Sequence, residues 1–380
     1  MAVKFSGKVF FYCVKPDTPD NTGYPHTIVC LGEGLSALGI KLYSDVNYWQ
    51  LSPEKEEYLF HHDPEVTPDD CDIVVLNHDW FTQAHRPLPK NLFHQNRKYV
   101  TVYMDGEDGS KTHSWLPECR QFDFIFKINY NSKVRYPSNI HPWAQGLSER
   151  MLRELKSISN FYDRKSHILV NFREVSKIRQ SVRRSTYDEF MPRIQKVLPV
   201  HNVVEGLNNF SSEPYHYLNW TQTGRRHSPN YYKGLQESVA CACFTGYFVT
   251  SWPQDIASPA SRILKRLLVK LRLKTSTIID WDSWRFWESL AAGCVGFHED
   301  FEKYGLFVPV MPKNWHHYIG IDFDNIQEPV DRIADDPDIL ERIASEGRLW
   351  VLEHYAPVPT TIRFLKTIGN TCWIRGINSS

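Results

Sequence analysis

The sequence predicts an α/β protein made of two Rossmann-like, doubly wound domains that face each other across a cleft. Short, continuous apolar runs, typical of strands buried on both faces of a parallel sheet, alternate with helix-length segments. Residues 139–146 (NIHPWAQG) interrupt this alternation of strands and helices, which resumes after them. At 380 residues, the chain is also long enough for about two domains. We therefore expect one domain over residues 1–146 and a second over residues 147–380, with the last helix free to pack back on the first domain.

The first half contains five expected strands, joined by helices or by turn-rich connections. Residues 8–14 (KVFFYCV) form the clearest apolar run. A helix should follow over residues 26–38, because Pro25 suits a first helical position and Gly39 a position just past a helix end. The other strands are expected at residues 40–46, 72–77, 99–104 and 122–128. Strands and helices in series imply a parallel sheet, on which ligands bind beyond the carboxyl ends of the strands.

The second half repeats this pattern after a bridging helix, which we expect at residues 147–160. Its strands are expected at residues 167–172, 239–244 and 294–297, and its helices at residues 176–185, 187–197, 284–292 and 337–355. Apolar residues in the last of these helices recur at helical spacing, which indicates one buried face.

Composition narrows the classes of function. Basic and acidic residues number 44 each, so the formal net charge is zero and no global field attracts nucleic acid. We therefore expect no nucleic-acid partner, although the neutral total leaves room for local basic patches. The eight cysteines form no C-x-x-C pair and lie mostly in apolar runs, as reduced thiols of cytosolic proteins do. The first apolar run is too short for a signal peptide, and no stretch reaches the ~20 apolar residues that span a bilayer, so we expect a soluble, cytoplasmic protein.

Residues 282–295 (DSWRFWESLAAGCV) carry the most informative motif. They predict a charged turn, a short helix bearing Arg285 and Glu288, a stop at Gly293 and a buried strand. Side chains three residues apart lie on the same side of a helix. The carboxylate can accept hydrogen bonds from ribose hydroxyls, while the guanidinium and the free N–H groups of the helix start can hold a diphosphate. The plainer interpretation is that Glu288 caps or neutralises the helix and Arg285 is a solvated partner.

Two Rossmann-like halves with this segment late in the second resemble the GT-B glycosyltransferases, most closely their exostosin-like, group 1-like branch. The family segment reads roughly Ser-x-Arg-x-x-Glu-Ala-x-x-Ala-Gly-Cys-Val-Pro. The positions in register are Ser283, Arg285, Glu288, Ala292, Gly293, Cys294 and Val295. Gly296 departs from the pattern, because the family usually has proline there. The specific likeness covers roughly residues 230–300.

The resemblance implies an enzyme that moves a sugar from a nucleotide-sugar donor to a hydroxyl of a glycan or glycolipid acceptor, with no separate cofactor. It places Glu288 on the donor ribose and Arg285 or Ser283 near the diphosphate. A non-catalytic module that binds a sugar nucleotide or a glycan is the alternative. A dinucleotide enzyme is disfavoured, because neither half has a G-x-G-x-x-G turn after its first strand.

Other donor contacts are expected from two loops of the second half. Asn171 and Arg173 follow its first strand, where a phosphate-facing loop should lie, although Arg173 fits a surface charge equally well. Thr245 and Gly246 end the strand before the motif, so their backbone has room to approach the base or the ribose. A plain turn explains these two residues almost as well.

An inverting transferase needs a general base to take the proton of the acceptor hydroxyl. Asp105 and Glu107 follow a strand of the first half in the turn MDGEDG, and crowded carboxylates raise one another's pKa. We expect Asp105 to be the first candidate, with His26 as its rival and the pair His78–Asp79 as a weaker option. The alternative for the turn is a solvated loop, which Asp-Gly favours by itself.

The stereochemical outcome stays open at the level of sequence. Asp280 and Glu288 have the spacing of the Glu-x7-Glu pattern of retaining GT-B enzymes, whereas the exostosin-like register implies inversion, which we favour. Asp280 and Asp282 also resemble the metal-binding Asp-x-Asp of another transferase fold. That motif belongs between strands, and here it precedes the nucleotide-binding helix, so we expect no metal ion.

Residues 261–275 (SRILKRLLVKLRLKT) form a basic amphipathic segment. Its pattern suits an anionic membrane surface, which would make the protein peripheral to a membrane. The alternative is an inserted helix that packs its leucine face on the domain and leaves its cations in solvent.

Overall fold

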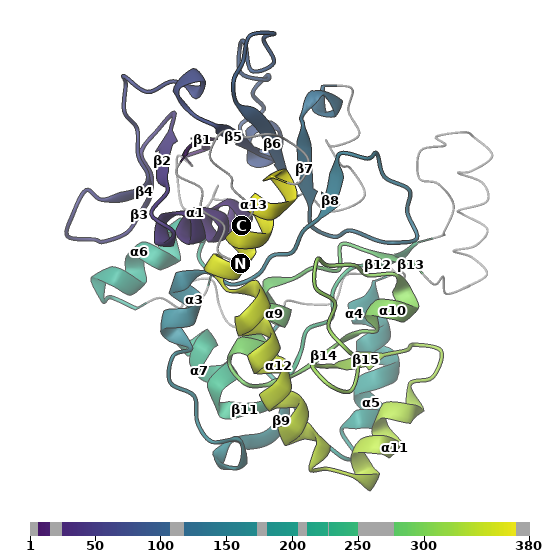
Figure 1. Ribbon diagram of the computed structural model, residues 1–380. Coiled ribbons are helices and arrows are strands. Elements are labelled where there is room, and N and C mark those ends of the chain that lie inside the picture. Colours follow the sequence, from purple (N-terminus) through teal and green to yellow (C-terminus); the bar gives the residue numbers. More distant parts are fainter. Residues whose placement is uncertain are drawn as a thin grey trace.

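Two α/β domains, each built on a parallel sheet, make up the computed structural model of the chain (Figure 1). The structure describes residues 7–15, 25–106, 118–172, 181–203, 211–226, 228–249 and 277–369. The predicted fold class, two doubly wound halves in series, is confirmed.

The N-terminal sheet has six parallel strands in the order β2-β1-β5-β6-β7-β8. Their bounds are β1 Lys8–Tyr12, β2 Lys41–Ser44, β5 Ile73–Asn77, β6 Val100–Asp105, β7 Phe124–Lys127 and β8 Ile140–Pro142. A hairpin of β3 (Tyr48–Gln50) and β4 (Tyr58–Phe60) lies beside the β2 edge. All five strands predicted for this half are present.

Different parts of the chain bury the two faces of this sheet. Successive residues of a strand point to opposite faces, so Val9 and Phe11 lie in one core and Phe10 lies in another. Helices α1 (His26–Ala37) and α13 (Pro357–Gly369) cover the first face. The short helix α2 (Asp79–Thr82) and the connections around β6 cover the second.

The C-terminal sheet has five parallel strands in the order β10-β9-β11-β14-β15. Their bounds are β9 Lys165–Val170, β10 Val200–Asn202, β11 Ser238–Ala242, β14 Val295–Glu299 and β15 Ile319–Ile321. A small antiparallel pair, β12 (Tyr247–Val249) and β13 (Thr277–Ile279), follows β11. The helices of this half are α3 Glu149–Glu154, α4 Val182–Ser185, α5 Met191–Ile194, α6 Pro214–Gln222, α7 Pro229–Glu237, α9 Trp284–Ala291, α10 Phe301–Tyr304, α11 Gln327–Asp335 and α12 Ile339–Tyr355.

Three helices differ from their predicted form. Within the described residues, which resume at residue 181, the helices expected at residues 176–185 and 187–197 form one continuous segment over residues 182–194, in which a π-helical turn (Thr186–Phe190) separates α4 from α5. Pro192 lacks the N–H that a regular α-helix would use there, and a wider turn accommodates that loss. The bridging helix is shorter than predicted, since only α3, capped by the Ser148 hydroxyl, is α-helical.

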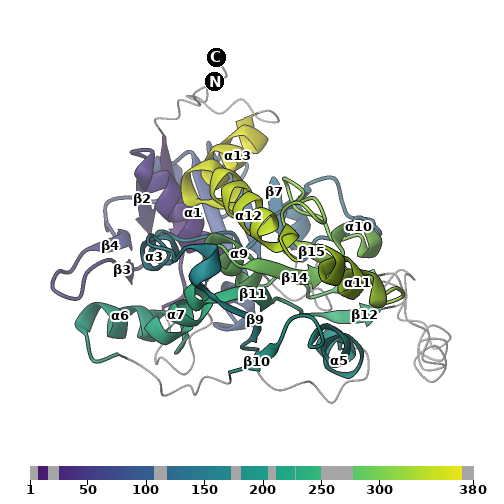
Figure 2. The ribbon, with the colours of Figure 1, turned by 90° about the horizontal axis from the view of Figure 1, so that it is seen from below.

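The chain crosses between the domains twice, and the two crossings touch. At the first crossing the Leu147 N–H donates to the carbonyl oxygen of Tyr355, 2.9 Å away, at the second. After Tyr355 the chain enters α13, which packs back on α1 and places Phe364, Leu365 and Ile368 in the core of the N-terminal sheet (Figure 2). Close packing is possible because Gly34 of α1 has no side chain where α13 begins.

Hydrogen bonds also join the domains directly. After β7, the Asn131 Nδ2 donates to the carbonyl oxygens of Ile278 and Tyr304, at 3.0 and 2.9 Å. The Gln222 side chain of α6 exchanges two hydrogen bonds, of 2.7 and 3.1 Å, with the backbone of Gln50 in β3. The two halves therefore contact each other on both sides of the crossings.

Over the described ranges, no helix has the length and apolar character needed to cross a bilayer. The basic amphipathic segment at residues 261–275 lies outside the described residues. Seven cysteines lie within those residues; all are buried and none forms a disulfide.

We predict that Gly34→Ala destabilises the protein by about 1–3 kcal/mol or more, because the added methyl overlaps the Pro357 carbonyl and the Thr361 hydroxyl. Gly234→Ala is the matched control, since its methyl meets only ordinary contacts in α7 and alanine favours helix. Chemical denaturation measures both. Equal stability of Gly34→Ala and the wild type would contradict close α1–α13 packing.

Candidate functional site

The candidate site lies at the carboxyl ends of the C-terminal strands, where helix α9 begins. Asn171 follows β9, Thr245 follows β11, and Ser283 is the residue just before α9. Parallel strands end at the same edge of a sheet, so residues far apart in the sequence meet there.

The structure brings together two of the predicted donor-binding residues, Asn171 and Arg285. The Arg285 Nε donates to the Asn171 Oδ1 over 2.6 Å, and a terminal nitrogen lies 3.5 Å from the Asn171 carbonyl oxygen. The guanidinium lies over the buried Phe172 ring, 5.8 Å from its centroid. Its orientation is thus fixed by a polar and an aromatic contact. Arg173 lies outside the described residues.

A second guanidinium, which the sequence analysis did not single out, lies beside the first. Arg183 of α4 lies over the same Phe172 ring, 5.1 Å from its centroid, and its Nε donates to the Phe244 carbonyl oxygen over 3.1 Å. Burial, and then repulsion from Arg285, lower the pKa of Arg183 to about 10. Two cations held on one ring make a site for a doubly charged anion. The only hint in the sequence was the basic run before residue 185.

Ser283 fixes the start of α9. Its hydroxyl accepts a hydrogen bond from the Arg285 N–H at 3.3 Å, so its observed role is that of a helix cap. The preceding residue, Asp282, is buried, and its two carboxylate oxygens accept from the Trp287 indole and the Gln145 backbone N–H, at 2.7 and 2.8 Å. Burial raises the pKa of Asp282 to about 6. These contacts attach α9 to the first crossing between the domains.

Glu288 is buried and engaged by two tyrosines of α7. The Tyr231 hydroxyl donates to Oε2 over 2.6 Å and the Tyr232 hydroxyl donates to Oε1 over 3.3 Å. Burial raises the pKa of Glu288, and the Tyr231 hydrogen bond opposes that rise. The sequence gave no sign of these partners, because they lie more than 50 residues earlier in the chain.

Thr245 and Gly246 lie in the connection between β11 and β12, next to the site. The Thr245 N–H donates to the Glu299 carboxylate over 2.9 Å, and its hydroxyl lies 3.4 Å from Arg183. Gly246 has a φ of 86°, and a Cβ there would overlap the Ile279 carbonyl oxygen. Glycine is therefore required to pack this connection against β13.

In the first half, Asp105 ends β6 and pairs with Lys127 at the end of β7. The two charges are 3.2 Å apart, and both side chains are almost fully buried. This partner follows from strand register, since the two residues lie opposite each other in the sheet. Glu107 lies outside the described residues.

His26 is buried at the start of α1. Its Nε2 lies 3.1 Å from the Gly146 carbonyl oxygen and 3.3 Å from the Cys30 sulfur, and its ring is 5.9 Å from the Trp284 ring. Burial lowers the pKa of His26 to about 3, so the imidazole is neutral. It sits between α1 and the first crossing, next to the start of α9.

A histidine and a carboxylate form a compact network at the end of β5. The His78 Nε2 is 3.1 Å from the Asp79 Oδ1, and its Nδ1 is 3.1 Å from the Asn77 Oδ1. The Asn77 amide in turn donates to the other Asp79 oxygen over 2.7 Å. The Asp79 side chain is 4% exposed and that of His78 is 17% exposed, so the ring is the accessible member. This arrangement resembles a base held in place by a buried carboxylate.

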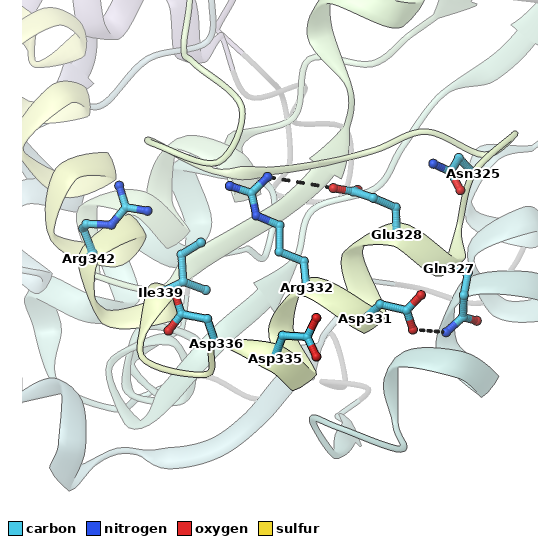
Figure 3. A pocket seen from close by; sticks show the side chains of 9 residues that line it. All are labelled: Asn325, Gln327, Glu328, Asp331, Arg332, Asp335, Asp336, Ile339 and Arg342. Atoms are coloured by element: carbon cyan, nitrogen blue, oxygen red, sulfur yellow. Dashed lines mark hydrogen bonds and ion pairs between the residues drawn. The ribbon is translucent and has the colours of Figure 1, made fainter.

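One cavity within the described part of the chain is remote from these groups, and the charge of its wall does not suit an anionic donor. It measures about 600 Å³, lies along α11 and the start of α12, and is shown in Figure 3. Carboxylates dominate its wall, and Arg332 is turned toward Glu328. A negatively charged donor would be repelled there. A smaller cavity of about 90 Å³ adjoins the candidate site through Asn171 and Tyr231.

Comparison with known proteins identifies the architecture. Neither a protein-family model nor a curated protein sequence matches the chain. An α-glucosyltransferase, solved with UDP and a 13-mer DNA containing a central A:G mismatch, matches with a TM-score of 0.53 at 9% identity, over 96% of this chain and 100% of that one. The α-glucosyltransferase solved with UDP and DNA containing an HMU base matches with a TM-score of 0.52 at 10% identity, over 95% and 99%. The chain has the GT-B fold.

The comparison also corrects one prediction. We expected no nucleic-acid partner because the net charge is zero, but the matched glucosyltransferase is described in complex with DNA. The exclusion is wrong because net charge averages over the whole surface, whereas a binding surface depends on local charge. Assignment to the exostosin-like branch stays a prediction.

We predict that Asp105→Ala destabilises the protein by about 3–5 kcal/mol, because it leaves the Lys127 charge buried without its carboxylate. The double variant Asp105→Leu/Lys127→Met should recover most of this loss. Denaturant unfolding measures both variants. If Asp105→Ala were as stable as the wild type, Asp105 would be free for another role.

The lowered pKa of the buried His26 should make the stability of the protein depend on pH. Between pH 7 and pH 5 the unfolded chain binds a proton at this histidine and the folded protein does not, so stability falls by about 2 kcal/mol as the pH decreases. His26→Gln should remove this part of the fall. His85→Gln, at an exposed position, is the control and should not. The measurement is the free energy of unfolding at both pH values, and equal slopes for wild type and His26→Gln would contradict the assignment.

Proposed function

We propose that the protein is a glycosyltransferase that takes a sugar from a nucleoside-diphosphate donor and transfers it to an acceptor hydroxyl. The observation that carries this proposal is the pair Arg183 and Arg285, held side by side over Phe172 at the carboxyl edge of the C-terminal sheet. The matched fold supports the class of reaction.

A diphosphate fits this pair for an electrostatic reason. The two guanidiniums repel each other, which contributes to the lowered pKa of Arg183, and a doubly charged anion between them would remove that repulsion. Asn171 fixes the plane of the Arg285 guanidinium and so prepares it for a bidentate contact. The positive end of the α9 dipole lies on the same side and adds to the attraction.

Glu288 keeps its proposed role at the ribose, with one condition. Its carboxylate is occupied by the Tyr231 hydroxyl, so ribose recognition requires a ribose hydroxyl to replace that phenol or to bind beside it. Tyr231 also lines the small cavity next to Asn171, which leaves space for this exchange.

We assign acceptor activation to His78. Asp105 is paired with Lys127 and His26 is enclosed against Gly146, whereas the His78 ring is partly exposed and oriented by Asp79. In the proposed step, Nε2 donates its hydrogen to Asp79, and Nδ1 turns from the Asn77 oxygen to take the proton of the acceptor hydroxyl as the hydroxyl oxygen bonds to the anomeric carbon. The bond from that carbon to the diphosphate breaks, and the leaving diphosphate keeps the electron pair beside Arg183 and Arg285. Attack on the face opposite the diphosphate inverts the anomeric centre, and we propose that these arginines balance its charge without a metal ion.

Nucleotide binding tests the donor site. Calorimetry with UDP, GDP, CMP and dTDP should find one that binds, and Arg183→Ala or Arg285→Ala should each weaken that binding by about 10- to 100-fold. Arg342→Ala removes the same charge from the cavity of Figure 3 and should leave the affinity unchanged. Equal weakening by all three variants, or by none, would contradict the proposed site.

Turnover and stereochemistry test the assignment of His78. His78→Ala should reduce transfer or donor hydrolysis by about 10²- to 10⁴-fold and leave donor affinity unchanged. His85→Ala, at an exposed position in the same connection, is the matched control and should retain activity. NMR of the first product formed should show an inverted anomeric centre. A retained configuration, or full activity of His78→Ala, would overturn this role, and binding without turnover on any acceptor would indicate a binding module instead.

A further inference from the structure

A stretch of the C-terminal domain that the proposed function does not use has an unusual composition. Residues 214–236 contain no aspartate or glutamate, but they contain five tyrosine or tryptophan residues and three arginine or lysine residues. They lie between β10 and β11 and form α6 and α7. Glu213 precedes α6, and Glu237 ends α7 and pairs with Lys233 over 3.7 Å. The positive charge of the stretch that this ion pair does not balance is that of Arg225 and Arg226.

Aromatic rings and guanidiniums from this stretch stack on one another. Tyr217 is 47% exposed and its ring stacks on Trp220, with centroids 5.8 Å apart and planes at 29°. The Arg225 guanidinium lies over the Trp220 ring at 5.4 Å. The next residue, Arg226, lies over the ring of Trp284 at 5.2 Å.

This row of side chains leads to the candidate donor site. Trp284 is the first residue of α9, and Arg285 follows it. We call Tyr217, Trp220, Arg225, Arg226 and Trp284 the aromatic–arginine row. Between Trp220 and Arg225, the end of α6 lies beside β3 of the N-terminal domain, where Gln222 is bonded to Gln50 (Figure 2). The row therefore runs along the contact between the two domains, toward the place where an acceptor must arrive.

We propose that the aromatic–arginine row binds an unpaired stretch of nucleic acid, and that the acceptor hydroxyl belongs to nucleic acid. Exposed bases stack on aromatic faces such as that of Tyr217, while the buried Trp220 supports Tyr217 and Arg225. Arg225 and Arg226 would meet the phosphates that connect those bases. A neutral glycan would use the rings but would have no need for the two guanidiniums. A duplex fits less well, because its base faces are covered by neighbouring pairs.

The carboxylates near the row are consistent with this proposal. Glu213, at the start of α6, accepts hydrogen bonds from the N–H groups of Tyr215 and His216, and Glu154 lies 3.5 Å from the His216 ring. Glu54, Glu56 and Glu57 lie in the turn of the β3–β4 hairpin, beyond Gln50. They would repel a nucleic acid from that edge and favour a path toward α9.

Binding of a labelled 12-nucleotide single strand, followed by fluorescence anisotropy, tests the proposal without any donor. The full chain should bind it more tightly than the matching duplex. Arg225→Gln/Arg226→Gln should weaken binding at least tenfold and reduce the slope of log affinity against log salt by about 1.4, and Tyr217→Ala should weaken binding about tenfold. Arg342→Gln is the control for loss of an exposed charge and should bind as the wild type does.

The proposal would be overturned if the wild type did not bind the single strand, or if Arg342→Gln weakened strand binding as much as the row variants do. It would also be overturned if the row variants lost binding to a maltooligosaccharide and kept binding to the strand, since the row would then be a glycan site. The acceptor assignment rests on the proposed function, but binding to the row does not. UDP calorimetry on the same variants separates the two, because Tyr217→Ala and Arg225→Gln should retain UDP binding. If the wild type binds UDP but not the strand, this inference alone is contradicted; if it binds the strand but not UDP, the donor site alone is contradicted.

Discussion

Two positively charged side chains, Arg183 and Arg285, are held over the same aromatic ring, and the candidate donor site depends on this arrangement. Arg183 and Arg285 come from helices that begin more than 100 residues apart, and both lie over Phe172. Such a pair is unfavourable by itself, because burial and mutual repulsion both oppose the charged forms. The fold maintains it through acceptors aimed at each guanidinium, the Phe244 carbonyl for one and the Asn171 side chain for the other.

The same helix that carries Arg285 also connects the site to the domain arrangement. Asp282, just before α9, accepts hydrogen bonds from Trp287 inside the helix and from Gln145 at the first crossing. A few residues away, Leu147 is bonded to Tyr355 at the second crossing. A change in the angle between the domains would therefore displace the start of α9. In the first domain, the network of His78 and Asp79 ends β5 at the edge that faces ligands in folds of this kind.

Much of the fold could be predicted because buried parallel strands leave continuous apolar runs in the sequence, as in residues 8–14 and 239–244. Helix α13 could not be predicted, because the two prolines at its start are typical of a turn. The helix forms because its apolar face packs against α1. At the site, Arg285 and Asn171 were found because they lie on a recognisable motif and after a strand. Arg183 was missed because it lies in a run of basic residues, and nothing in the sequence distinguishes it from its basic neighbours.

The partners of the remaining candidates depend on tertiary contacts. Tyr231 reaches Glu288 from another helix, so no local pattern could reveal it. Lys127 was a clearer omission, because a lysine that ends an apolar strand next to Asp105 in register is a signal for a buried ion pair. The net charge of zero also led to a wrong exclusion of nucleic acid. Acidic and basic residues cancel in the total even where they lie apart, as the carboxylates around α11 and the acid-free residues 214–236 do.

A crystal structure with bound UDP would locate the donor diphosphate. We expect phosphate oxygens within hydrogen-bond distance of both Arg183 and Arg285, with the ribose next to Glu288 and Tyr231. A nucleotide bound in the N-terminal domain, or in the C-terminal domain without contact to either arginine, would contradict this placement.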